Sequence, residues 1–148
     1  MKNIQSIILL LFLVPPVFVF AQSGEVYTTK DGAIDGYDPV AFFKEQKPMK
    51  GKKELVYDWN GAKWYFSSQD NLNEFKANPE KYAPQYGGYC AYGTADGHKA
   101  PTKVDTWTVV EDKLYFNYNQ DVKKLWSKNQ KELILKADKN WPTVKKEK

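Results

Sequence analysis

The sequence contains no arginine, one cysteine (Cys90) and one histidine (His98). Without arginine, it lacks the planar guanidinium that recognises guanine and phosphate through paired hydrogen bonds. Its 22 lysines are mixed along the chain with 18 acidic residues, and the net charge is only +4. A single cysteine excludes an internal disulfide, and one Cys plus one His is too few for a four-ligand zinc site. We therefore expect neither nucleic-acid binding nor a disulfide-stabilised fold.

Familiar catalytic patterns are also missing. Gly87-Gly88 lacks the flanking residues of a phosphate-binding loop, and no serine lies in a nucleophile elbow that would pair with His98. The carboxylates of Asp105 and Glu111 fit the surface of a hairpin better than a catalytic pair. The sequence favours a binding protein over an enzyme without deciding between them.

The N-terminal segment has the pattern of a signal peptide. Lys2 precedes an almost wholly apolar stretch over residues 7–20, and an alanine follows at the predicted cleavage point. The apolar stretch is shorter than the roughly 20 residues that a spanning helix needs, and Pro15-Pro16 interrupts it. Residues 1–21 are therefore predicted to be removed on export. The expected product is periplasmic or secreted, with no stable membrane span.

The rest of the chain is predicted to form one domain. A polar lead-in over residues 22–32 precedes a domain over 33–142, and a basic tail follows over 143–148. No repeat or long linker divides this region. All five tryptophans of the chain lie within it, and they supply large apolar area for a core.

Two hairpins are predicted from turn residues between alternating apolar segments. Asn60-Gly61 favours a type I′ turn between residues 55–59 and 62–67. The expected pairs across this turn are Trp59–Ala62, Asp58–Lys63, Tyr57–Trp64 and Leu55–Phe66. The second hairpin turns at Glu111-Asp112, between residues 106–110 and 113–118, and places Trp107, Val109, Leu114 and Phe116 on one face.

Helices are predicted where a capping residue precedes an apolar pattern. The expected helical segments are a turn begun by Asp38, a helix capped by Ser67 or Ser68 and ending near Ala77, a turn from Asn78 to Tyr82, and a final helix from Asn119 to Pro142. Residues 85–93 are expected to form a loop. Hairpins interspersed with helices predict an α+β fold, in which helices pack on a small antiparallel sheet.

Several motifs, taken in order, resemble those of the YHS domain. They are Asp38-Pro39-Val40-Ala41-Phe42-Phe43, Trp64-Tyr65-Phe66-Ser67-Ser68 and the segment Phe75 to Tyr82. The segments Tyr86 to Ala91 and Lys113 to Tyr118 are similar to the longer, exported branch, the YHS domain-containing (seleno)proteins. The resemblance spans roughly residues 33–142 and implies a YHS-like fold.

The resemblance implies metal binding, because YHS domains occur in heavy-metal and copper transport proteins. It also implies a special role for Cys90, since the exported branch can carry selenocysteine at that position. Metal-associated YHS domains often have Cys where this chain has Ala41, and His or Cys where it has Ser67. Two soft ligands of the family pattern are therefore missing, and Cys90 is the only thiol left.

The resulting hypothesis is a metal site at Cys90, with His98 as a possible partner eight residues later. A thiolate and an imidazole suit a soft ion, so Cu(I) is favoured over Zn(II). Two alternatives remain open. Cys90 could act in thiol redox chemistry with a partner protein, since the chain has no resolving cysteine. The chain could instead bind a small ligand or partner in an aromatic pocket, with a merely packed Cys90, and the expected residues are Tyr86, Tyr89, Tyr92 and Trp107.

Overall fold

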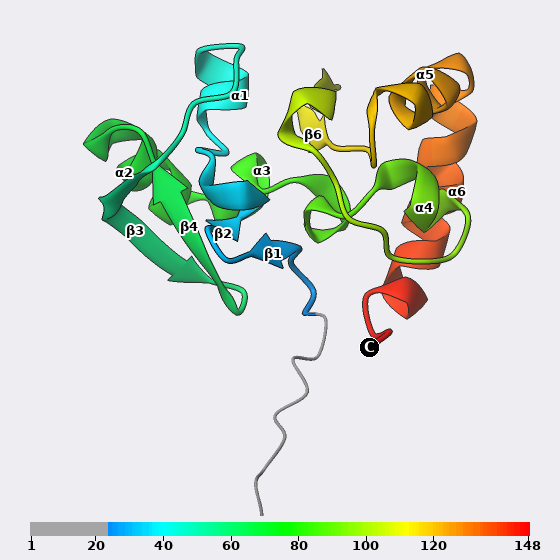
Figure 1. Cartoon of the computed structure of the whole chain (residues 1–148), viewed down its shortest axis with the longest axis horizontal. Coiled ribbons are helices and arrows are strands. Elements are labelled where there is room, and N and C mark those ends of the chain that lie inside the picture. The colour runs from blue at the N-terminus through cyan, green and yellow to red at the C-terminus, as the bar shows by residue number, and fades with distance from the viewer. Residues whose placement is uncertain (1–23) are drawn as a thin grey trace, which may run out of the picture.

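The computed structural model describes residues 24–148, so the predicted signal peptide lies outside the described residues (Figure 1). The architecture is α+β, as predicted, but the strands form three separate two-stranded antiparallel sheets. The strands are β1 (Thr28–Thr29), β2 (Gly32–Ala33), β3 (Lys52–Trp59), β4 (Ala62–Phe66), β5 (Thr108–Val110) and β6 (Lys113–Tyr115). The α-helices are α1 (Ala41–Lys44), α2 (Gln69–Ala77), α3 (Pro79–Tyr82), α4 (Ala91–Ala95), α5 (Gln120–Lys128) and α6 (Gln130–Val144). Three 3₁₀ turns are η1 (Ile34–Gly36), η2 (Gln85–Gly88) and η3 (Val104–Thr106).

The β3–β4 hairpin has the predicted turn, with φ of +49° at Asn60 and +74° at Gly61. The three predicted pairs nearest the turn are confirmed. The predicted Leu55–Phe66 pair is wrong, because a register shift in β3 pairs Phe66 with Lys52. Extra residues in one strand bend it, and sequence alternation does not reveal them.

The larger core cluster packs beneath this hairpin. Phe75 of α2 lies at its centre, with ring centroids 5.2 Å from Trp64 and 5.1 Å from Phe66. Helix α2 begins where predicted, because the Ser68 hydroxyl accepts a hydrogen bond from the Asn71 N–H. Helix capping thus aims the apolar face of α2 at the sheet.

The second hairpin is shorter than predicted. Strand β5 begins only at Thr108, because the preceding residues form the η3 turn. The predicted apolar face is confirmed, since its residues Trp107, Val109, Leu114 and Phe116 all pack into the larger core cluster.

Three sequence-based expectations for the C-terminal half are wrong. Residues 85–93 are not an irregular loop, because η2 and the start of α4 lie there. The predicted final helix is two helices that meet at Asn129, whose φ of −129° is not helical. Pro142 does not end α6, which continues to Val144. A proline in the last turn removes only one backbone hydrogen bond, and Lys145 N–H still donates to the Trp141 carbonyl.

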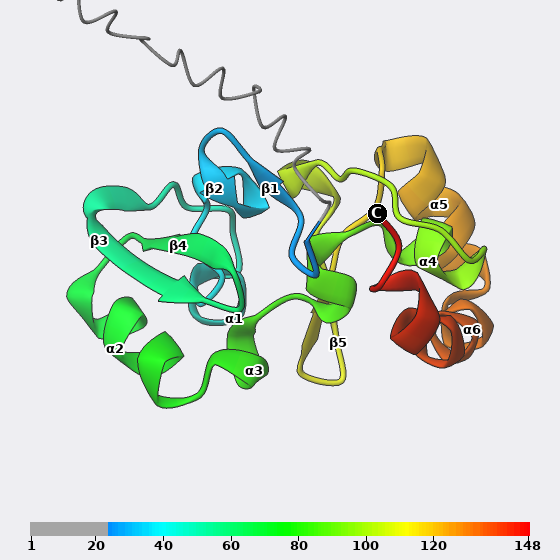
Figure 2. The same cartoon turned by 90° about the horizontal axis from the view of Figure 1, so that it is seen from below.

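A smaller core cluster joins α4, α5 and α6. Its buried residues are Tyr86, Ala91, Ala95, Tyr115, Trp126 and Ala137. Figures 1 and 2 show these three helices at one end of the molecule and the β3–β4 hairpin with α2 at the other. The η2 turn and the β5–β6 hairpin lie between the two ends, so residues on them border both clusters.

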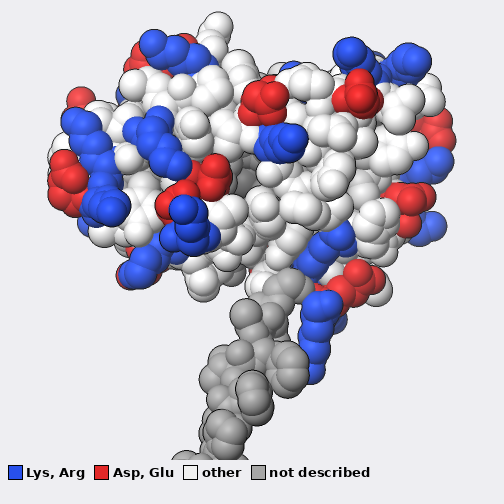
Figure 3. Space-filling view, in the orientation of Figure 1, with Lys and Arg blue, Asp and Glu red and all other residues white. Residues whose placement is uncertain are grey.

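Lys99 links the two ends of the described chain. Its Nζ donates hydrogen bonds to the carbonyl oxygens of Gly24, Lys145 and Glu147, at 3.3, 3.1 and 2.7 Å. The space-filling view shows lysine and acidic side chains interspersed on the visible face rather than gathered into one patch (Figure 3). No helix within residues 24–148 is long and apolar enough to span a membrane.

Candidate functional site

Cys90 lies at the junction of η2, α4 and the end of the β5–β6 hairpin. Its N–H donates to the Ala100 carbonyl, and the next N–H, that of Ala91, donates to Phe116. These bonds fix the backbone on both sides of the residue. The side chain is only 1% exposed, and its Sγ accepts a hydrogen bond from the Gly93 N–H at 3.4 Å. Cys90 thus caps the first turn of α4 with its sulfur.

Asn117 is the hydrogen-bond acceptor for this thiol. The Cys90 thiol donates to Asn117 Oδ1 at 3.6 Å, and the same oxygen accepts the Tyr92 N–H at 3.2 Å. The Tyr92 N–H fixes the orientation of the Asn117 amide, so that its oxygen faces Cys90. The NH₂ group in that position would place two donors against each other. No residue pattern in the sequence distinguishes Asn117 from a surface asparagine, so its role was not predicted.

Burial raises the pKa of the Cys90 thiol above its ordinary value. Hydrogen bonds from the backbone of Gly93, Tyr118 and Tyr92 oppose this rise but do not overcome it. The thiol is therefore protonated at neutral pH. Because the thiolate is the reactive form, this cysteine is a weak nucleophile until something displaces its proton.

Cys90 borders a cavity of about 340 Å³. The lining residues are Cys90, Tyr92, Gly93, Asp96, His98, Ala100, Tyr118 and Val122. The structure therefore brings the two sequence-predicted metal ligands, Cys90 and His98, to one cavity. Metal binding by these residues stays a prediction.

Gly93 allows this arrangement. A Cβ at position 93 would lie 3.4 Å from His98 Nε2, while the Gly93 N–H donates to Cys90. His98 is more than half exposed, and its Nδ1 lies 4.0 Å from Asp96 Oδ2.

The four aromatic residues expected around one pocket do not come together. Tyr92 lines the cavity at Cys90, while Tyr86, Tyr89 and Trp107 each line a different cavity. They are spread because η2 turns the chain sharply between positions 86 and 89, and because Trp107 belongs to the face of the β5–β6 hairpin that joins the larger core.

Asp38 forms a second buried polar site, in the other half of the molecule. Its carboxylate is fully buried. Oδ1 accepts the N–H groups of Val40 at 2.8 Å and Ala41 at 3.3 Å. Oδ2 accepts the Ser67 N–H at 2.8 Å, the Ser67 hydroxyl at 2.7 Å and the Asn71 side-chain amide at 2.8 Å. The carboxylate is saturated with donors.

Ala41 and Ser67 are the two positions at which the resemblance implied soft ligands. The structure brings both of them to the Asp38 carboxylate, from α1 and from the end of β4. Neither residue has a side chain that binds a soft metal. Hydrogen bonds around a buried carboxylate therefore occupy the place where the family pattern has such ligands.

The donor set at Cys90 and His98 fits a metal ion of low coordination number. Among residues 24–148, no three His, Cys, Asp or Glu side chains are grouped so as to hold a metal ion. Zinc sites with protein ligands usually use three or four such groups, more than Cys90 and His98 supply. One thiol and one imidazole fit a soft monovalent ion.

Comparison with known proteins identifies the class of domain. Residues 40–86 match the family model of the YHS domain, so this segment, with α1, the β3–β4 hairpin, α2 and α3, is a YHS domain. YHS domains are associated with metal handling. No curated protein and no solved structure matches the chain. The match ends at Tyr86, before Cys90, and membership of the exported branch stays a prediction.

Proposed function

We propose that this protein binds copper(I) outside the cytoplasm, with Cys90 as the principal ligand and His98 as the second. The observation that carries the proposal is that Cys90 and His98 border the same cavity although eight residues separate them. The YHS domain beside them supports the proposal, since its family is associated with metal handling. The predicted signal peptide supports the location.

Charge favours a monovalent ion at this site. Binding replaces the Cys90 proton with the metal, so a thiolate, a neutral imidazole and Cu(I) together carry no net charge. A neutral complex avoids most of the penalty for placing charge beside a buried group. A divalent ion would leave one positive charge at the site. Asp96, the one carboxylate that lines this cavity, is exposed to solvent and so would offset that charge poorly.

Redox chemistry at Cys90 has weaker support. A thiol that reacts with oxidants or disulfides is exposed and has a lowered pKa. Cys90 is buried, burial raises the pKa of its thiol, and the chain has no second cysteine to resolve a disulfide. Cu(I) can displace the thiol proton through its affinity for sulfur, whereas an oxidant depends on the thiolate already present.

The test is an anaerobic titration of the purified protein with Cu(I) against a competing chelator. We expect one equivalent to bind, with ultraviolet thiolate-to-copper absorption, and Cys90→Ser to lose both signals. His98→Gln should weaken binding by about tenfold or more, in line with the loss of one of two ligands. Met49→Leu is the matched control, since it removes a thioether outside this cavity and should leave the affinity unchanged.

The pH dependence gives an independent check. Because the ion displaces one proton from a thiol whose pKa is raised, the apparent affinity should rise by about tenfold per pH unit until that pKa is passed. Uptake that is unchanged in Cys90→Ser, or that releases no proton, would contradict the proposal.

Export is tested separately. N-terminal sequencing of protein recovered from the extracytoplasmic fraction should begin at Gln22, directly after the predicted cleavage point. Protein that retains residues 1–21 in the cytoplasm would contradict the proposed location without affecting the metal titration.

A further inference from the structure

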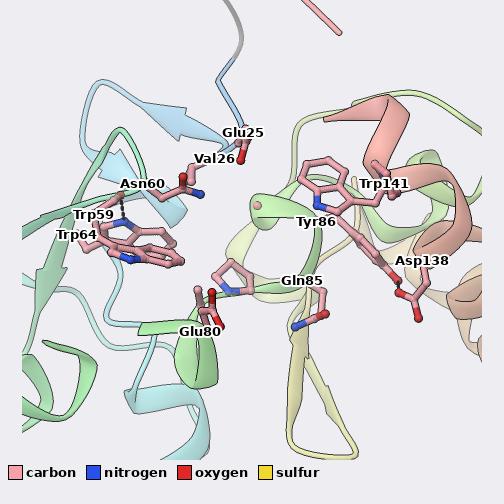
Figure 4. Close-up of a pocket in the computed structure, with 14 residues that line it drawn as sticks. Glu25, Val26, Trp59, Asn60, Trp64, Glu80, Gln85, Tyr86, Asp138 and Trp141 are labelled. Atoms are coloured by element: carbon pink, nitrogen blue, oxygen red, sulfur yellow. Dashed lines mark hydrogen bonds between the residues drawn. The ribbon is translucent and has the colours of Figure 1, made fainter. Parts of the chain in front are cut away.

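A second cavity, of about 390 Å³, lies between the turn of the β3–β4 hairpin, η2 and the C-terminal part of α6. Figure 4 shows two aromatic walls across it, with Trp59 and Trp64 on one side and Tyr86 and Trp141 on the other. Trp64 and Tyr86 are buried, whereas Trp59 and Trp141 are partly exposed. The partly exposed indoles therefore offer ring surface to a molecule that enters from solvent.

The charged residues that line this cavity are all acidic. Glu25, Glu80 and Asp138 are among its lining residues, and no lysine is among them. The chain as a whole has 22 lysines and 18 acidic residues, so a lining with three carboxylates and no lysine departs from the rest of the molecule. Glu25 has one weak ion pair, with its Oε1 3.9 Å from Lys145 Nζ. The cavity is therefore electrostatically suited to a cation.

The protein's own lysines do not occupy these rings. Within residues 24–148, four lysines lie over tyrosine rings, those of Tyr37, Tyr57, Tyr82 and Tyr89. None of these four rings lines the cavity. Within residues 24–148, no lysine therefore lies over Trp59 or Trp141, the two partly exposed rings of the cavity.

Tyr86 is held in place by an unusual backbone. Its φ of +56° lies in the left-handed region, which is strained for a residue other than glycine, and such strain clusters at ligand sites. Gly87 follows with φ of +61°, and a Cβ there would lie 1.7 Å from the Glu25 carbonyl oxygen. The Tyr86 hydroxyl donates to Asp138 Oδ1 at 2.8 Å. Burial raises the pKa of Tyr86 well above its ordinary value, so its hydroxyl remains a hydrogen-bond donor.

We propose that this cavity binds a small organic cation of the quaternary-ammonium class. Such a cation is attracted to the faces of tryptophan and tyrosine, and its methyl groups fill the space between the two aromatic walls. The three carboxylates add long-range attraction for the positive charge. Inorganic cations hold their hydration water and would gain little from the rings. This site is separate from the cavity at Cys90, and the proposal does not depend on copper binding.

The test compares choline with its neutral analogue 3,3-dimethylbutan-1-ol, which has the same shape but no charge. Calorimetric titration of the full chain should show one choline bound, and binding of the neutral alcohol should be about tenfold weaker or more, the range expected for a desolvated cation–π contact. Equal affinity for the two probes, or no choline binding at millimolar concentration, would overturn the proposal.

Variants separate the rings from the carboxylates. Trp59→Leu keeps an apolar side chain but removes the aromatic face, and it should weaken choline binding by about tenfold without strengthening binding of the alcohol. Glu80→Gln changes only an exposed charge, so it tests the carboxylates even if Trp59→Leu fails to fold. It should weaken choline binding about twofold at low salt, and the effect should shrink as salt is added.

Two control variants complete the design. Asp121→Asn removes an exposed carboxylate on α5, away from the lining residues, and should leave choline binding unchanged. Cys90→Ser should also leave it unchanged, which keeps this site distinguishable from the proposed metal site. A loss of choline binding in Asp121→Asn equal to that in Glu80→Gln would show nonspecific charge attraction and overturn the proposal.

Discussion

Asp38 and Cys90 are buried ionisable side chains in the two halves of the molecule, and their hydrogen bonds differ. Asp38, beside the β3–β4 hairpin, accepts five hydrogen bonds of 2.7 to 3.3 Å. Cys90, beside α4, has side-chain sulfur contacts of 3.4 and 3.6 Å and borders a cavity. The carboxylate has no capacity left for a ligand, whereas the sulfur can exchange a weak contact for a metal. The comparison separates a residue that holds the fold from one that is available for binding.

The largest expected effect is on the Asp38 side of this comparison. Asp38→Ala leaves five donors without their acceptor, the N–H groups of Val40 and Ala41 and three groups at Ser67 and Asn71. Because each buried unsatisfied donor costs about 1–3 kcal/mol, we expect the free energy of unfolding to fall by about 4 kcal/mol or more. Urea denaturation measures it. Asp58→Ala, which removes an exposed carboxylate from the same half, is the control and should stay near wild type.

Cys90→Ser should have a smaller effect on stability and a complete effect on copper uptake. Serine can still donate to Asn117 and accept from Gly93, but it loses the apolar contacts of sulfur. We expect a loss of about 1–2 kcal/mol in the free energy of unfolding. Thermal unfolding, measured on the same sample as the copper titration, separates the two effects. If Cys90→Ser were as unstable as Asp38→Ala, Cys90 would hold the fold as Asp38 does and the two groups would not differ in role.

Ser67→Ala tests the Asp38 site at a single bond. The Ser67 N–H and the Asn71 amide still donate to Oδ2. The change removes the hydroxyl, with its 2.7 Å bond to Oδ2 and its 3.5 Å contact from the Asn71 amide. We expect about 1 kcal/mol of destabilisation in urea denaturation. Ser127→Ala removes an exposed hydroxyl that bonds the Lys123 carbonyl and should be close to neutral. If the two variants lost the same free energy of unfolding, the Ser67 hydroxyl would contribute no more to stability than an exposed one.

The smallest expected effect is the pH dependence of stability due to Cys90. Its pKa is raised in the folded state, so the folded protein keeps a proton that the unfolded chain releases above its ordinary thiol pKa of about 8.5. Stability from this group is complete below that value and is lost as pH rises, by less than about 1.4 kcal/mol per pH unit. Denaturation between pH 7.5 and 9.5 should show this loss in wild type and its absence in Cys90→Ser. The same pH dependence of the free energy of unfolding in wild type and in Cys90→Ser would contradict the raised pKa of Cys90.

Local signals in the sequence predicted local structure well. The Asn60-Gly61 turn and its three nearest pairs, the Ser68 cap of α2 and the Asn119 cap of α5 are all as predicted. Each depends on residues within a few positions of one another. The shift in β3 and the break at Asn129 were missed because they depend on packing against distant segments, which no short pattern records.

The candidate sites show the same difference between local signals, which the sequence reveals, and tertiary contacts, which it does not. Cys90 and His98 were found because rare residue types stand out in a sequence. The role of Asp38 was predicted only as the start of a helical turn, since its partners Ser67 and Asn71 lie 29 and 33 residues away. The cavity between Trp59 and Trp141 could not be predicted, because it is lined by segments that only tertiary folding brings together.

The hydrogen bonds of Lys99 have a consequence for protein engineering. One ammonium group contacts backbone carbonyls at both Gly24 and Glu147, so the two ends of the described chain lie close together. A short Gly-Ser linker could therefore join residue 148 to residue 24, and new termini could be opened at the exposed Asn60-Gly61 turn. We expect such a circular permutant to reach the same fold, with Lys99 bridging the covalent junction instead of two chain ends.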